Sequence, residues 1–116
     1  MLKNSLIKMI AKIVETKINH LTNATKKVYL KSGVVNNLMQ FASAEFKKMD
    51  FIEPHMHNTM TEVFYVEFGK IKVTLNNDSF IVNTEDVFVV SSKVIHSFKF
   101  IENTKIVYFG INDTKI

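Results

Sequence analysis

The chain has 116 residues and no cysteine, so we expect a single domain without disulfides, thiolate metal ligands or a cysteine nucleophile. All fifteen basic residues are lysines, and nine of them lie in residues 1–50, which hold only three acidic residues. The chain therefore has no guanidinium group to bind phosphates through two hydrogen bonds, and its basic and aromatic residues do not alternate. We expect no nucleic-acid partner.

The first segment, residues 2–19, has the spacing of an amphipathic helix. Its apolar residues recur at intervals of three and four, with charged residues between them: Leu2, Leu6, Met9, Ile10, Ile13, Val14 and Ile18. We expect this helix to pack on the domain or on a partner subunit, the alternative being a helix on a membrane surface. His20 then sits at its end, favoured by the helix dipole rather than serving as a ligand.

This segment also bears on localisation. Lys3, Lys8 and Lys12 interrupt the apolar stretch, so it offers neither a signal-peptide core nor a membrane span. Together with the lack of cysteine, this favours a cytoplasmic protein with no membrane partner. We divide the chain into an N-terminal helical extension, residues 1–25, and a β domain, residues 26–116.

Beyond residue 26 the pattern changes to short runs of β-branched and aromatic residues separated by turn signals. The predicted strands are 27–32, 37–43, 45–48, 51–57, 62–68, 70–75, 79–83, 87–91, 94–100 and 105–111. So many short strands favour an antiparallel barrel or sandwich. Residues 67–82 read as a meander that turns at Gly69 and again at Asn76–Asp78.

Four polar side chains stand out against these strands. Side chains alternate along a strand, so His55 and His57 share a face, and Glu62 begins the next apolar strand. His96 opens a later strand. Three neutral imidazoles and a carboxylate would suit Fe, Mn, Ni, Co, Cu or Zn. The alternative for the His-x-His pair taken alone is a surface or satisfied core position.

The same alternation predicts an apolar pocket near these residues. The members we expect on the inner face are Met39, Phe41, Phe64, Val66, Phe98 and Phe100. These side chains either fill the interior or line a cavity suited to a small apolar or aromatic ligand that coordinates the metal.

The stretch from His55 to Gly69 resembles the first motif of the cupin superfamily, G-x5-H-x-H-x3–4-E-x6-G, and residues 85–100 resemble the second, G-x5-P-x-G-x2-H-x3-N. The spacing is kept, but the turn residues differ. Met49, Glu85 and Lys93 stand at motif glycines, Ser91 at the proline and Phe100 at the asparagine. The resemblance covers roughly residues 37–111.

The resemblance implies a cupin-type antiparallel β-barrel, a double-stranded β-helix or jelly roll, with His55, His57, Glu62 and His96 as metal ligands. Small cupins commonly pair, so we expect a homodimer. Fold alone does not select the reaction. We expect a metal-dependent enzyme, an oxygenase or a related lyase or isomerase, in which metal-bound water or Glu62, the expected catalytic residue, transfers protons. The alternatives are a non-catalytic metal- or ligand-binding cupin, including a sugar-related one, and an interaction protein with a vestigial site.

Overall fold

The computed structural model describes residues 15–19 and 24–114, and ten strands account for most of them. The strands are β1 (Glu15–Asn19), β2 (Ala24–Leu30), β3 (Leu38–Phe46), β4 (Phe51–His55), β5 (Met60–Phe68), β6 (Lys70–Leu75), β7 (Asp78–Asn83), β8 (Val87–Val90), β9 (His96–Phe100) and β10 (Thr104–Asn112). Within these ranges there is no helix, so none that could cross a membrane.

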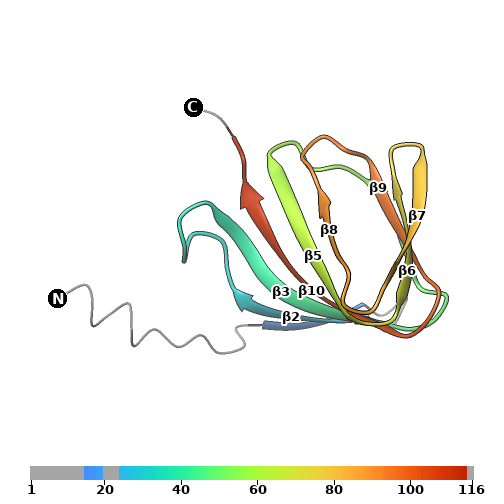
Figure 1. Cartoon of the computed structure of the whole chain (residues 1–116). Coiled ribbons are helices and arrows are strands. Elements are labelled where there is room, and N and C mark those ends of the chain that lie inside the picture. The colour runs from blue at the N-terminus through green and yellow to red at the C-terminus, as the bar shows by residue number, and fades with distance from the viewer. Residues whose placement is uncertain (1–14, 20–23, 115–116) are drawn as a thin grey trace.

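The strands form two antiparallel sheets that face each other (Figure 1). The larger has six strands in the order β1-β2-β3-β10-β5-β8, and the smaller has four in the order β4-β9-β6-β7. In the described part of the chain no strand ladder joins one sheet to the other, so the architecture is a two-sheet sandwich rather than the closed barrel that we expected. The all-β, antiparallel character is confirmed.

The helix predicted over residues 2–19 is wrong for residues 15–19. They form β1, which pairs with β2 in the register Glu15↔Val28 to Asn19↔Ala24. Pairing gives β2 a hydrogen-bonded neighbour, and such tertiary pairing overrides a local helical pattern. The rest of the predicted helix, residues 2–14, and His20 lie outside the described residues.

Two predicted turns have different outcomes. The β6–β7 hairpin is confirmed, because Leu75 pairs with Asp78 across a two-residue loop in which Asn76 has φ 53°. At Gly69, however, the chain does not fold back but crosses from the six-stranded to the four-stranded sheet. Gly69 has φ 116°, and a Cβ there would lie 2.7 Å from the Cα of Thr104, so the crossing requires glycine.

The core lies between the two sheets. Its largest fully buried member is Phe100, and Phe64 stacks on Phe88 with ring centroids 4.9 Å apart while Phe98 meets both rings edge-on. The apolar side chains that complete this cluster are Ala44, Val66, Ile71, Val73, Val82, Val90 and Ile106. Packed aromatic rings of this kind fix the separation of the sheets, and so the shape of the cavity beside them.

Candidate metal centre

The strand ladders bring the predicted polar residues together. His55 ends β4 and pairs directly with His96, the first residue of β9. His57 lies two residues beyond β4, where its carbonyl accepts a hydrogen bond from the Lys93 N–H at 2.7 Å. Glu62 belongs to β5 in the opposite sheet. Segments about forty residues apart in sequence thus converge at one end of the sandwich.

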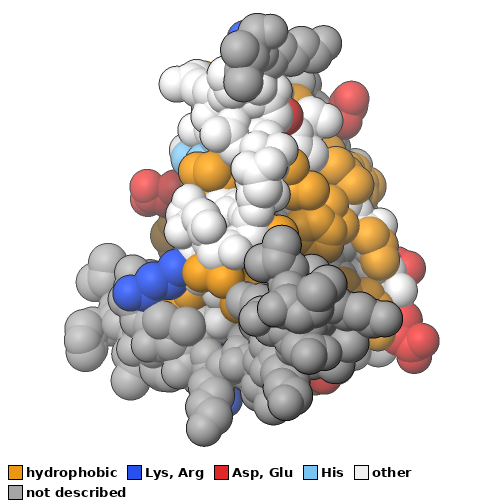
Figure 2. Space-filling model, turned by 90° about the vertical axis from the view of Figure 1, so that its left-hand side faces the viewer, with side chains coloured by type: hydrophobic (Ala, Val, Ile, Leu, Met, Phe, Trp, Pro, Cys, Tyr) orange, Lys and Arg blue, Asp and Glu red, His pale blue; other side chains and the backbone are white. Residues whose placement is uncertain are grey.

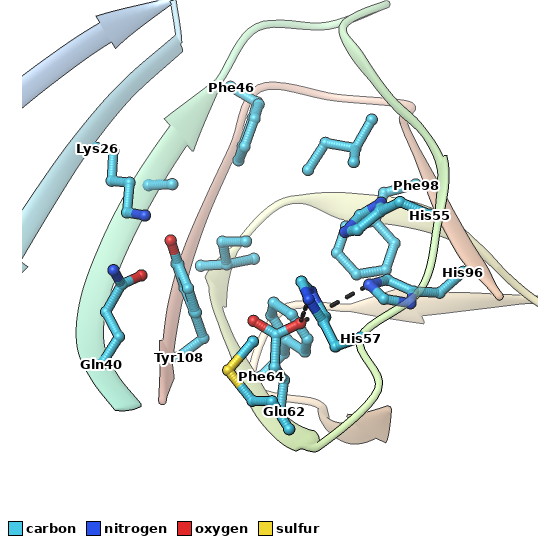
Figure 3. Close-up of a pocket in the computed structure, with 14 residues that line it drawn as sticks. Lys26, Gln40, Phe46, His55, His57, Glu62, Phe64, His96, Phe98 and Tyr108 are labelled. Carbon is cyan, nitrogen blue, oxygen red and sulfur yellow. Dashed lines mark ion pairs between the residues drawn. The ribbon is translucent and has the colours of Figure 1, made fainter. Parts of the chain in front are cut away.

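Three imidazoles form the centre of this site. The ligand atoms of His55, His57 and His96 all lie within 4.8 Å of one another, and the ring centroids of His55 and His96 are 4.0 Å apart. Glu62 lies against two of the rings, with Oε1 3.3 Å from His57 Nε2 and 3.7 Å from His96 Nε2 (Figure 3). The structure therefore brings the three expected imidazole ligands together, with the Glu62 carboxylate beside two of them.

Backbone hydrogen bonds fix which ring nitrogen of two histidines is available. His55 Nδ1 lies 2.9 Å from the carbonyl of Glu53, and His96 Nδ1 lies 3.0 Å from the carbonyl of Val94. A carbonyl can only accept, so Nδ1 carries the hydrogen in both rings. In the neutral imidazole Nε2 then keeps its lone pair, which is the arrangement that metal-binding histidines adopt.

One atom in the site lacks a hydrogen-bond partner. His96 is 1% exposed, and its Nε2 is the buried side-chain polar atom for which the described residues supply no partner. The Glu62 oxygen, 3.7 Å away, is beyond hydrogen-bonding distance. A buried lone pair left in this way is costly, and a cation bound by the cluster would satisfy it. The donor set, three imidazole nitrogens and a carboxylate, fits a divalent transition metal.

Burial shifts the protonation of the site toward neutral groups. It lowers the pKa of His96 and of His57, and the neighbouring His55 lowers both further, although the Val94 carbonyl and Glu62 act in the other direction on His96. Burial raises the pKa of Glu62, which the nearby histidines and Lys26 partly offset. Neutral rings have the free lone pairs that metal binding requires.

The cluster opens into a cavity of about 360 Å³ between the sheets. Phe64 and Phe98 line it, as expected. Val66 and Phe100 are fully buried and fill the core instead. The remaining lining residues are Lys26, Gln40, Ala44, Phe46, Ile52, Met60, Ile106 and Tyr108, together with the four polar residues of the cluster.

Met39 and Phe41 are not in the cavity wall, which corrects the prediction for β3. The inner face of β3 carries Gln40 and Ala44 instead, and Phe41 packs against Tyr29 with ring centroids 5.3 Å apart. The alternation was assigned one residue out of phase, because the outer face of β3 is also apolar and hydrophobicity alone does not distinguish its two faces.

Sequence reasoning missed Lys26 and Gln40, which form part of a polar wall of this cavity. Lys26, at the predicted domain boundary, lies in β2, and it and Gln40 reach the cavity from the inner face of the six-stranded sheet. Tyr108 of β10 joins them, and burial followed by the charge of Glu62 raises its pKa, so its hydroxyl stays protonated. A lysine at alternating spacing with Ala24 and Val28 was the available signal.

The fold and the cluster define a two-sheet antiparallel protein with a three-histidine centre beside an internal cavity. The chain belongs to the cupin family, because the family model described as a cupin domain matches residues 43–111, more than half of the chain. No curated protein sequence matches it.

Solved structures show the same fold at low sequence identity. A predicted oxalate decarboxylase from Thermotoga maritima is 17% identical with a TM-score of 0.76, covering 90% of this chain and 99% of that one. KdgF from Halomonas sp. is 17% identical with a TM-score of 0.69, covering 94% and 90%. An RmlC-like cupin from Shewanella frigidimarina is 17% identical with a TM-score of 0.70, covering 92% and 96%. At this identity the likeness concerns the fold alone.

Proposed function

We propose that this cupin binds a divalent transition metal, Fe, Mn, Ni, Co, Cu or Zn, and uses it to transform a small molecule. His55, His57 and His96 are the nitrogen ligands, and Glu62 is the fourth. The observation that carries the proposal is the cluster of three imidazoles within 4.8 Å, in which the buried Nε2 of His96 has no hydrogen-bond partner.

A divalent metal bound there would supply a Lewis acid with open positions for substrate or, for a redox-active ion, dioxygen. The protein's own groups supply the rest. Glu62 is 8% exposed, and in the metal-free chain burial raises its pKa. With the metal bound, proton transfer would fall to the Glu62 oxygen that does not bind the metal. The Phe64 and Phe98 rings would hold an apolar or aromatic body and exclude water.

These groups suit an oxygenase, or a related lyase or isomerase, acting on a small metal-coordinating substrate. The alternative is a non-catalytic cupin that binds metal and a small ligand, including a sugar-related one. Tyr108 favours this alternative, because its raised pKa leaves it a hydrogen-bond donor rather than a second base. Dioxygen consumption by Fe- or Mn-loaded protein distinguishes the oxygenase from the binding protein.

Metal analysis of two ligand variants tests the proposal. We expect stoichiometric metal in protein purified without chelator, and less than about a tenth of it in His55→Ala and His96→Ala, because each removes a nitrogen ligand. Both variants should stay folded by circular dichroism, since the aromatic core is untouched. Ser97→Ala, next to His96, is the control that keeps its metal. Unloaded wild-type protein, or variants that load normally, would show that the ligand assignment is wrong.

A further inference from the structure

The cavity has a second polar wall, across from the histidines. Lys26, Gln40 and Tyr108 come from the neighbouring strands β2, β3 and β10. The register places them on one face, because Lys26 pairs with Ala44, Tyr108 pairs with Ala42, and Gln40 lies two residues before Ala42. Their polar ends converge in the cavity, on the opposite side from His55 and His96 (Figure 3).

These three side chains offer hydrogen-bond donors of different kinds. Lys26 contributes an ammonium group, with Nζ 5.9 Å from the centroid of the Tyr108 ring. Tyr108 contributes a hydroxyl group and Gln40 the NH₂ of its amide. An ammonium flanked by two neutral donors is suited to the two oxygens of a carboxylate, and charge-assisted hydrogen bonds of this kind are the strong ones.

The charges of the cavity also favour an anion. Among the described residues that line it, Lys26 is the one lysine and Glu62 the one carboxylate. With a divalent cation on the histidines the cavity would carry a net positive charge, which an anionic ligand would reduce. Phe64 and Phe98 line the same cavity, so an apolar body suits this ligand.

We propose that Lys26, Gln40 and Tyr108 form a carboxylate-binding subsite, which takes the acid group of a small ligand whose apolar body extends toward the three histidines. This inference rests on the proposed function in one respect, namely that the end of the ligand farther from the carboxylate binds the metal ion. It assigns a substrate class to the cavity, namely small carboxylic acids with an apolar or aromatic body, and it makes Lys26 the residue that selects acids over their neutral analogues.

Calorimetric titration with a matched pair of probes tests this assignment. The probes are 3,4-dihydroxybenzoate and 3,4-dihydroxybenzamide, which share a metal-chelating end and a ring but differ by one charge. On Zn²⁺-loaded wild-type protein we expect the acid to bind about tenfold more tightly than the amide. In Lys26→Met, which keeps an unbranched side chain without the ammonium group, the two dissociation constants should agree within about twofold. The exposed Lys72→Met is the matched control and should keep the tenfold preference.

Zinc content, measured on every sample, separates this proposal from the proposed function. If wild-type protein takes up no zinc, the metal site is wrong, and the subsite is then tested on the same protein with benzoate and benzamide, with the same expected preference. Equal binding of acid and neutral probe by wild-type protein overturns the subsite. A Lys26→Met variant that keeps the preference for the acid also overturns it, as does one that raises the dissociation constants of both probes by the same factor. If Lys26→Met does not fold, Tyr108→Phe is measured instead. It must raise the dissociation constant of the acid several-fold more than that of the amide.

Discussion

His96 is the residue in which burial and chemistry are most closely linked. It is 1% exposed, its Nδ1 is held by the Val94 carbonyl, and its Nε2 has no hydrogen-bond partner among the described residues. Burial lowers its pKa below 6.5, the ordinary value. The unfolded chain therefore takes up a proton at a higher pH than the folded chain does, so acid favours unfolding.

We predict that metal-free protein loses stability as the pH falls below about 6.5, the pKa of an exposed histidine. The contribution of His96 is fully present above that pH and is lost as the pH falls through its lowered folded pKa. His57, with a pKa lowered by burial, acts in the same direction. Glu62 acts in the opposite direction, because its raised pKa lets the folded state bind a proton first. Urea unfolding in the presence of EDTA, between pH 5 and 7.5, measures the net slope.

His96→Gln is the informative variant for this slope, because glutamine keeps a polar side chain that does not titrate. Its free energy of unfolding should depend less on pH than that of wild-type protein between pH 5 and 6.5. Thr74→Ala, a polar surface change in β6, should leave the wild-type slope unchanged. Parallel slopes for wild-type protein and His96→Gln would show that His96 is not the group that titrates.

At the scale of the elements, the connections show how the fold tolerates the lost motif glycines. Met49, Glu85 and Lys93 stand where the cupin motifs carry glycine, and their φ angles are 79°, 70° and 67°. Each backbone N–H donates to a carbonyl: Met49 to Phe100 at 2.8 Å, Glu85 to Val66 at 2.6 Å and Lys93 to His57 at 2.7 Å. The left-handed conformation is thus retained with side chains that disfavour it, and these hydrogen bonds hold it.

Lys93→Gly is therefore predicted to stabilise the protein. A left-handed residue with a Cβ costs about 1–2 kcal/mol, from which the greater flexibility of glycine in the unfolded chain subtracts, leaving a gain of about 0.5–1 kcal/mol. This corresponds to a melting temperature higher by about 2–6 °C in differential scanning calorimetry. Lys93→Ala keeps the Cβ and removes the charge, so it should give no gain. Equal shifts in the two variants would assign the effect to the charge.

Much of this site could be predicted from the sequence, because its residues follow two spaced motifs. The spacing His55, His57, Glu62 and the later His96 identifies the four residues that the structure brings together. The phase of β3 could not be predicted in the same way. The correct inner-face residue, Gln40, is polar, while Phe41 and Met39 on the other face are apolar, so the usual rule for strand faces selects the wrong one.

The helix prediction was wrong over residues 15–19 for a different reason. The spacing of its apolar residues fits a helix, but β1 forms because β2 presents a sheet edge to residues 15–19. β2 pairs on its other side with β3, so β1 adds to an existing sheet, which the apolar spacing of residues 2–19 does not indicate. Crossing of the chain between sheets at Gly69 is likewise a property of two sheets packed together, which single-strand reasoning reads as a simple turn.

At the scale of the whole molecule, the outer face of the six-stranded sheet has an apolar area, which Lys27 and the Glu67–Lys105 ion pair border. Register places two cross-strand rows on it: Val87, Tyr65 and Val107 in one, and Val89, Val63, Phe109 and Phe41 in the other. Val87, Val89 and Tyr65 are 60%, 49% and 38% exposed. Figure 2 looks onto this side of the molecule and shows hydrophobic side chains gathered there. A contiguous apolar patch without charges is typical of an interaction surface.

A second copy of the chain is the occupant that this face suits, so the homodimer stays a prediction, now with a location. The seven side chains named in the two rows carry no charge, and a two-fold axis would set these residues against their copies, apolar against apolar, as an isologous interface requires. β8, at the edge of the sheet, places Val89 in the patch. Val89→Lys would bury a charge in each half of this interface and should raise the dimer dissociation constant at least about tenfold.

Light scattering across micromolar concentrations measures this constant directly. Val34→Lys is the matched control, because Val34 is 50% exposed in the connection between β2 and β3, outside the two rows, and takes the same new charge. A wild-type chain that scatters as a monomer, or two lysine variants that dissociate alike, would contradict an interface on this face. Dissociation by Val89→Lys alone locates the contact on the outer face. The histidine cluster, which opens between the sheets, then remains accessible in the dimer.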